Sequence, residues 1–102
     1  MHSRRAMMYV PGDDLHKIQK AAGLPVDSLC LDIEDGVAQN RKDAAREVIG
    51  QALRELDFGG SERLVRINPL TSERGKADLE AVLPARPDGI VLPKVTSADE
   101  LV

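Results

Sequence analysis

Four short apolar segments alternate along the chain with three segments of helical periodicity, and this alternation constrains the fold more than any other feature. The strand-like segments are Ala6–Val10, Val26–Asp32, Arg63–Ile67 and Gly89–Leu92. The predicted helices between them are Leu15–Ala22, Arg41–Leu56 and Lys76–Leu83. Strands that alternate with helices predict a parallel sheet whose strands are joined by right-handed crossovers.

The helix over Arg41–Leu56 has the clearest pattern. Its apolar residues recur three or four positions apart and form one stripe, made of Ala45, Val48, Ile49, Ala52, Leu53 and Leu56. Asn40 is its predicted N-cap, and Asp13 and Asp14 can cap the helix before it. The third helix is expected to bury Leu79, Val82 and Leu83. Each helix therefore has one face suited to packing on the sheet.

The last residues resemble the start of a further helix. Ser97 and Glu100 have the spacing of a capping box, and Val102 follows about one turn later. We therefore expect an α/β fold that is the N-terminal half of a (β/α)8 TIM barrel, with about four βα units in residues 1–102. The remainder of the barrel and a C-terminal region would then be absent. The alternative is a small domain completed by swapping or by a partner chain.

Charge and hydropathy exclude several classes of protein. The formal net charge of −3 argues against a nucleic-acid-binding surface, which requires a basic face. No apolar run approaches the ~20 residues that a membrane span needs, and no secretory signal is recognisable. We therefore expect a cytoplasmic protein with neither nucleic acid nor membrane as partner. Cys30 lies inside an apolar segment and is expected to be a small core residue.

Polar side chains gather where the predicted strands end. Asp32, Glu34 and Asp35 follow an apolar run, and a carboxylate is costly to bury unless a cation pairs with it. In parallel α/β proteins, ligands bind at the carboxyl ends of the strands. The three acids therefore indicate a ligand-binding rim, or else a solvated acidic turn. Tyr9 and Lys94 would lie at the same edge, and a solvated loop is the alternative role for Lys94.

Arg66 is the most informative residue at this edge. A guanidinium inside an apolar strand needs an anionic partner that accepts two hydrogen bonds. That partner is either the acidic cluster or the carboxylate of a ligand. If the cluster alone fills this role, Arg66 belongs to a structural ion pair.

A metal ion and a phosphate are further candidate ligands. Carboxylates suit Mg²⁺, but neighbouring residues of a strand point to opposite faces, so Asp32, Glu34 and Asp35 cannot all bind one ion. Direct metal ligands are therefore expected beyond Val102. His16 and Lys20 share a helix face near a helix N-terminus, which suits phosphate, although a solvated basic face is the alternative.

Four motifs together resemble one enzyme family. They are Arg5–Gly12 (RAMMYVPG), Leu31–Ala38 (LDIEDGVA), Val65–Pro69 (VRINP) and Leu92–Val95 (LPKV). In this order they resemble the citrate lyase β-subunit and malyl-CoA lyase family, and the first two look most like its citramalyl-CoA lyase branch. The similarity extends over essentially the whole chain.

The resemblance implies a TIM barrel with Mg²⁺ as cofactor. Its reaction is carbon–carbon cleavage of a 3-hydroxyacyl-CoA thioester, such as citramalyl-CoA or malyl-CoA, to acetyl-CoA and a 2-oxo acid. Arg66 matches the family arginine that binds the substrate carboxylate. Tyr9, His16 and Lys20 fall where the family contacts CoA, although the family commonly has lysine in place of His16.

The remaining implied roles are supporting ones. Glu34 and Asp35 match an acidic pair beside the metal, with Asp32 and Lys94 nearby. The direct metal ligands and the catalytic acid–base aspartate correspond to positions beyond Val102, so no catalytic set is complete here. The 102-residue chain alone is expected to be inactive, and the full-length protein is expected to form a homo-oligomer, a trimer or hexamer.

Two other functions remain open from the sequence. One is a citrate lyase β-subunit proper, which acts on a citryl thioester of a carrier protein. The other is a non-catalytic, receiver-like domain that binds Mg²⁺, with Asp13 and Asp14 as its acidic pair. That fold needs a lysine at the end of a fifth strand, which the chain does not contain.

Overall fold

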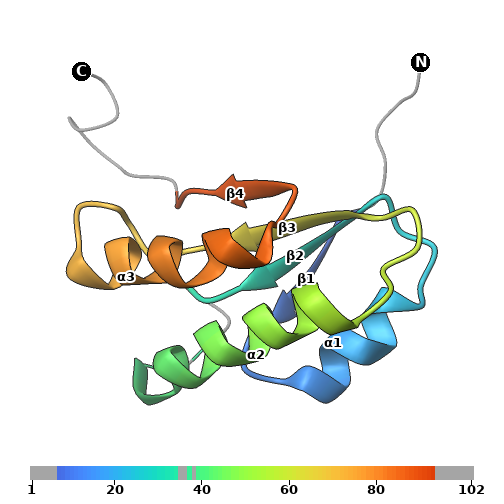
Figure 1. Cartoon of the computed structure of the whole chain (residues 1–102), viewed down its shortest axis with the longest axis horizontal. Helices are drawn as coiled ribbons and strands as arrows, with labels where there is room; N and C mark the ends of the chain where they lie inside the picture. Colours follow the sequence, from blue (N-terminus) through green and yellow to red (C-terminus); the bar gives the residue numbers. More distant parts are fainter. Residues whose placement is uncertain (1–6, 35–36, 38, 94–102) are drawn as a thin grey trace.

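The computed structural model describes residues 7–34, 37 and 39–93 (Figure 1). The strands are β1 (Met7–Pro11), β2 (Ser28–Asp32), β3 (Glu62–Arg66) and β4 (Gly89–Val91). The α-helices are α1 (Leu15–Ala22), α2 (Lys42–Glu55) and α3 (Glu73–Val82), and the short 3-10 helices are η1 (Gln39–Arg41) and η2 (Leu83–Ala85). The predicted alternation of strands and helices is confirmed.

The four strands form one sheet in the order β1-β2-β3-β4, and every neighbouring pair is parallel. Consecutive parallel neighbours are the arrangement found in the wall of a (β/α)8 barrel. A receiver-type doubly wound sheet has β1 between β2 and β3 instead. The observed strand order therefore contradicts the receiver-like alternative and agrees with part of a barrel.

The two faces of the sheet differ because successive side chains of a strand alternate between them. Val10, Leu31 and Val65 pack into the apolar core beneath the helices, together with Ile18 of α1 and Ile49 of α2. Figure 1 shows the helices together on this face. The opposite face has no described helix against it. It carries the alternate residues of the strands, among them Tyr9, Cys30, Asp32, Leu64 and Arg66.

Helix starts agree with the prediction for α1 and differ for α2 and α3. The Asp14 side chain accepts a hydrogen bond from the Lys17 backbone N–H at 3.0 Å and caps α1. Asn40 is not the N-cap of α2. It lies within η1, and α2 follows Arg41 with no side-chain cap. Helix α3 begins at Glu73, three residues before the predicted start, because Ser72 accepts from the Gly75 N–H at 3.0 Å.

The remaining differences concern segment ends. Strand β2 begins at Ser28 and not at Val26, and β4 ends at Val91 and not at Leu92. Leu83 was expected to be buried, but 51% of it is exposed, because α3 ends at Val82 and Leu83 is the first residue of η2. The predicted helix start at Ser97–Glu100 lies outside the described residues, as does Ala6.

The longest helix of the described residues, α2, has 14 residues, and none of the described helices is long and apolar enough to cross a bilayer.

Candidate functional site

Arg66 and Asp32 form a two-point ion pair where β3 and β2 end. Arg66 Nε donates to Asp32 Oδ1 at 3.0 Å, and Arg66 Nη2 donates to Asp32 Oδ2 at 2.8 Å. The strand register produces this contact, since the two residues are direct neighbours across β2 and β3. The Asp32 side chain is 4% exposed and that of Arg66 22%. A fork-like pair of this kind fixes the plane of the guanidinium.

Glu34 joins the pair through a tight turn after β2. Its backbone N–H donates to Asp32 Oδ1 at 2.9 Å, and its Oε1 lies 3.6 Å from Arg66 Nε. The Ile33 N–H donates to the Arg66 carbonyl at 2.8 Å, which extends the β2–β3 pairing into the turn. Asp32 and Glu34 therefore both face Arg66.

Tyr9 supports the guanidinium from β1. The Arg66 guanidinium carbon lies 4.8 Å from the centre of the Tyr9 ring, within the range of a cation–π contact. Tyr9 is 48% exposed, so the ring covers the guanidinium only in part. We call Tyr9, Asp32, Glu34 and Arg66 the edge cluster. Tyr9, Asp32 and Arg66 come from the adjacent strands β1, β2 and β3, and Glu34 comes from the turn after β2.

Gly12 allows the loop after β1 to approach this cluster. Its N–H donates to the Asp32 carbonyl at 2.8 Å. A Cβ at this position would lie 2.8 Å from that oxygen and 2.5 Å from Ile49 Cδ1. A larger residue would therefore displace the loop from the end of β2.

Cys30 lies one alternation before Asp32 and is fully buried. Burial raises the pKa of its thiol from 9.0 to about 11, and the charge of Asp32 acts in the same direction. The thiol therefore stays protonated near neutral pH, which agrees with the predicted role as a core residue and not a nucleophile.

The edge cluster does not amount to a direct metal site. Asp32 and Glu34 both contact Arg66, and a divalent cation would have to compete with that guanidinium. No group of three or more histidine, cysteine, aspartate or glutamate side chains suited to a metal occurs among the described residues. Asp35, which the sequence placed beside a metal, lies outside them.

The other predicted site residues are only partly brought together. Tyr9 and Lys20 line one groove of about 370 Å³ beside α1. His16 is exposed on the same helix but is not among the residues that line this groove. Lys94 lies outside the described residues.

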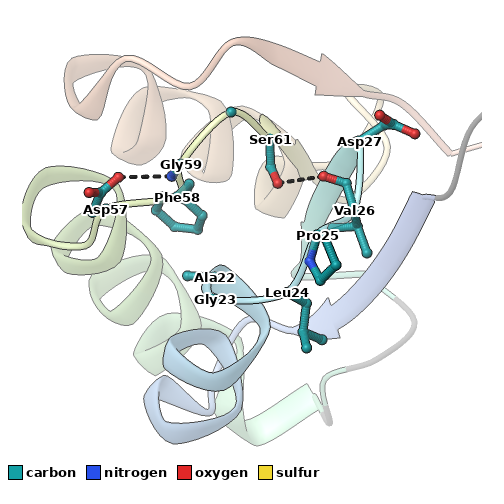
Figure 2. A pocket seen from close by; sticks show the side chains of 11 residues that line it. Ala22, Gly23, Leu24, Pro25, Val26, Asp27, Asp57, Phe58, Gly59 and Ser61 are labelled. Carbon is teal, nitrogen blue, oxygen red and sulfur yellow. Dashed lines mark hydrogen bonds between the residues drawn. The ribbon is translucent and has the colours of Figure 1, made fainter.

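A larger hollow lies at the opposite end of the strands. It measures about 550 Å³ between the loops that precede β2 and β3 (Figure 2). The Asp57 side chain accepts a hydrogen bond from the Gly59 N–H in the same turn, and the Ser61 hydroxyl donates to the Val26 carbonyl (Figure 2). The Ser61–Val26 hydrogen bond joins the two loops, and the two aspartates that line the hollow, Asp27 and Asp57, are exposed. In parallel barrels this end serves stability, so we assign no ligand to it.

Residues 5–102 match the family model described as HpcH/HpaI aldolase/citrate lyase. The chain belongs to this family. The resemblance inferred from the four motifs is therefore confirmed. Among curated relatives, mitochondrial citramalyl-CoA lyase of Rattus norvegicus is 48% identical over 100 residues, which are 96% of this chain and 30% of that protein. The (3S)-malyl-CoA thioesterase of Cereibacter sphaeroides (strain ATCC 17029 / ATH 2.4.9) is 40% identical, over 98% of this chain and 35% of that protein.

Solved structures of similar sequence share the fold. Protein CitE of Mycobacterium tuberculosis in complex with magnesium and pyruvate has a TM-score of 0.74 and 34% identity. The match covers 91% of this chain and 37% of that one. The chain thus spans about a third of the length of the relatives it matches. The barrel-type α/β fold predicted from the sequence is confirmed.

Two charged residues that contact these strand ends were not predicted. Lys42, at the start of α2, donates to two carbonyls of the turn that carries Glu34. Asp78 of α3 accepts from Asn68, two residues after Arg66. A lysine at a helix start resembles any solvated lysine in sequence, so no signal pointed to Lys42. Asp78 carried a weak one, because it shares a helix face with the buried Val82.

Proposed function

We propose that this chain forms part of a Mg²⁺-dependent carbon–carbon lyase that cleaves a 3-hydroxyacyl-CoA thioester such as citramalyl-CoA or malyl-CoA. The products would be acetyl-CoA and a 2-oxo acid. The observation that carries the proposal is the Arg66 guanidinium, held by Asp32 and Tyr9 yet 22% exposed at the strand edge. The similarity to citramalyl-CoA lyase, and to a CitE structure in complex with magnesium and pyruvate, supports it.

Arg66 is the proposed site for the carboxylate of the 2-oxo acid. A guanidinium has five N–H groups in one plane, and a two-point pair with Asp32 engages two of them. Such a side chain can hold Asp32 and a ligand carboxylate together. Because Asp32 and Tyr9 already orient it, ligand binding does not have to order a mobile side chain.

Tyr9 and Lys20 are the proposed contacts of the CoA portion. Both line the groove between β1 and α1, and Tyr9 also contacts the Arg66 guanidinium. Lys20 is exposed and would face the phosphates of CoA, and His16 of the same helix would extend that basic surface.

Magnesium is part of the proposal through the relatives. The described residues do not supply its coordination, since the two edge carboxylates pair with Arg66. We place its direct ligands, and the catalytic acid or base, beyond Val102. Asp35 and Lys94 are proposed supporting residues near the metal and the substrate. The 102-residue chain alone is accordingly proposed to be inactive, and the full-length protein to act as a homo-oligomer.

The test is an assay of the full-length protein with citramalyl-CoA, malyl-CoA and Mg²⁺. Arg66→Met should lower kcat/KM on the order of 100-fold or more, because the carboxylate loses its charged partner. Arg66→Lys should recover little, since an ammonium cannot make the two-point contact. Arg54→Met on the exposed face of α2 is the matched control and should change kcat/KM less than about twofold. Activity retained in Arg66→Met would contradict the role of Arg66, and turnover by the 102-residue chain would contradict its inactivity.

Thioester hydrolysis is the second candidate, because a malyl-CoA thioesterase is 40% identical to this chain. Product analysis separates the two reactions. A lyase releases acetyl-CoA and a 2-oxo acid, whereas a thioesterase releases free CoA and the hydroxy diacid. A third assay with a citryl carrier-protein thioester tests the citrate lyase β-subunit alternative.

A further inference from the structure

Lys42 is a buried lysine whose hydrogen bonds, among the described residues, go to one turn. It is the first residue of α2, and 5% of it is exposed. Its Nζ donates to the Ile33 carbonyl at 2.6 Å and to the Glu34 carbonyl at 2.5 Å. Both acceptors belong to the turn after β2. The ammonium therefore bridges the start of a helix to the turn that completes the edge cluster.

Nothing in the local helix explains a buried lysine here. Burial removes the hydration of an ammonium, which costs free energy unless it is paired. The positive end of a helix dipole also disfavours a cation in the first turn. The exposed Lys17, Lys20 and Lys76 avoid the first of these costs. For Lys42, hydrogen bonds to the Ile33 and Glu34 carbonyls offset both the desolvation cost and the unfavourable helix dipole.

The same two residues of the turn are held from the other side by the edge cluster. The Ile33 N–H donates to the Arg66 carbonyl, and the Glu34 N–H donates to Asp32 Oδ1. Lys42 binds their carbonyls, so both peptide units next to the Glu34 Cα are fixed. With its backbone held in this way, the Glu34 carboxylate lies 3.6 Å from Arg66 Nε.

We propose that Lys42 is a positioning residue of the substrate site. It holds the Ile33–Glu34 backbone so that Asp32 and Glu34 face Arg66 together, and thereby fixes the guanidinium that binds the substrate carboxylate. The effect on catalysis rests on the proposed function, whereas the effect on geometry does not. The alternative is that Lys42 only joins α2 to the sheet.

Nuclear magnetic resonance of the ¹⁵N-labelled protein tests the geometry without any substrate. In Lys42→Met we expect the Glu34 amide to exchange with solvent at least about tenfold faster, and the Arg66 Nε–H resonance to shift. Lys42→Arg retains the charge and the donors, and should restore both signals in part. Lys76→Met, on the exposed side of α3, is the matched control and should leave both signals unchanged.

Wild-type Glu34 and Arg66 signals in a folded Lys42→Met variant would overturn the proposal. If Lys42→Met lacks the circular dichroism of the native fold, Lys42→Gln, a shorter uncharged donor, is measured instead, and wild-type signals there would overturn it equally. In an active full-length enzyme, Lys42→Met should lower kcat/KM roughly 10- to 100-fold and Lys42→Arg less. Altered signals with unchanged kcat/KM would refute the link to catalysis. Inactivity of the wild type would refute the proposed function and leave the resonance test decisive for the geometry.

Discussion

Two arginine–aspartate pairs lie on opposite sides of the sheet and resemble each other closely in burial. Arg66 and Asp32 meet at 2.8 Å on the face without a described helix, with side chains 22% and 4% exposed. Arg46 of α2 and Asp78 of α3 meet at 2.6 Å on the helical side, with side chains 17% and 0% exposed. Distance and burial alone therefore do not separate a candidate ligand site from a structural contact.

The surroundings of the two aspartates separate them. Asp78 also accepts from the Asn68 backbone N–H at 3.0 Å and from Asn68 Nδ2 at 2.7 Å. Together with Arg46, these donors join α2, α3 and the loop after β3. Close packing completes the junction, because a Cβ on Gly75 would lie 2.0 Å from the Pro69 carbonyl oxygen. The carboxylate of Asp78 is enclosed by the chain's own donors, which is the environment of a structural residue.

The surroundings of Arg66 in the edge cluster differ from those of the Arg46–Asp78 pair. Asp32 holds one edge of Arg66, and Tyr9, itself 48% exposed, covers part of its plane. The sheet face around it carries no described helix. The comparison shows that the surroundings of the arginine, and not the burial of the aspartate, distinguish an ion pair at a candidate ligand site from a structural ion pair.

Removal of Asp78 should have the largest effect on stability. Asp78→Ala removes the anionic partner of Arg46 and the acceptor of two hydrogen bonds that Asn68 donates. Loss of one member of a buried ion pair lowers the free energy of unfolding by about 3–5 kcal/mol. Urea denaturation of both proteins measures the difference. Asp43→Ala is the control, since Asp43 contacts the same Arg46 at 2.7 Å but is 86% exposed, and it should cost below about 1 kcal/mol. Equal losses in the two variants would contradict the structural role of Asp78.

Removal of Arg66 should have a smaller effect on stability than on ligand binding. In Arg66→Met, the buried Asp32 carboxylate loses the Arg66 guanidinium but keeps the hydrogen bond from the Glu34 N–H, so we expect a loss of about 2 kcal/mol. Denaturation of Arg66→Met and of the double variant Asp32→Asn/Arg66→Met gives the measurement. The double variant should recover part of the loss because position 32 no longer carries a buried charge. A loss as large as that of Asp78→Ala would make the edge cluster a structural contact like the other.

The sequence allowed prediction of the edge cluster better than of the Asp78 junction. Strand direction alone places the ends of β1, β2 and β3 together, so Tyr9, the acids and Arg66 follow from the alternation of elements. The junction depends on how α2 and α3 pack, which no local pattern specifies. Gly75 illustrates the difference. Within Glu73–Ala77 a glycine argues against a helix, yet the close approach of the Pro69 carbonyl requires it there.

The prediction of helix boundaries was wrong in places for a related reason. Asn40 is a favourable cap residue, but the chain forms the 3-10 turn η1 before α2 begins. The turn brings Lys42 under Ile33 and Glu34, and this tertiary contact outweighs the local preference for a cap. Leu83 was expected in the core on periodicity, and Pro84 ends the α-helix before that residue can pack.

A third ion pair, Arg63 and Asp88, lies at the surface. Its removal should change the free energy of unfolding less than removal of either of the other two pairs. Asp88 is 44% exposed, and hydrogen bonds from the Arg63 side chain and then its backbone N–H lower the pKa of this carboxyl from its ordinary value of 3.8. Because the pKa of Asp88 is lower in the folded state, its contribution to the free energy of unfolding is complete at pH values above the pKa of the unfolded state. The contribution is lost as the pH falls through the pKa of the folded state.

Asp88→Asn should therefore be less stable than the wild type by no more than about 1 kcal/mol near neutral pH. The difference should shrink once the pH falls below about 4, and added salt should reduce it, since the pair is open to solvent. Urea denaturation at a series of pH values measures both trends. Asp78→Ala breaks contacts with both Arg46 and Asn68, Arg66→Met leaves Asp32 the hydrogen bond from the Glu34 N–H, and Asp88 is 44% exposed, so the three losses should decrease in this order. A loss for Asp88→Asn that persists unchanged at pH 2 would show that shape, and not charge, joins β3 to the loop before β4.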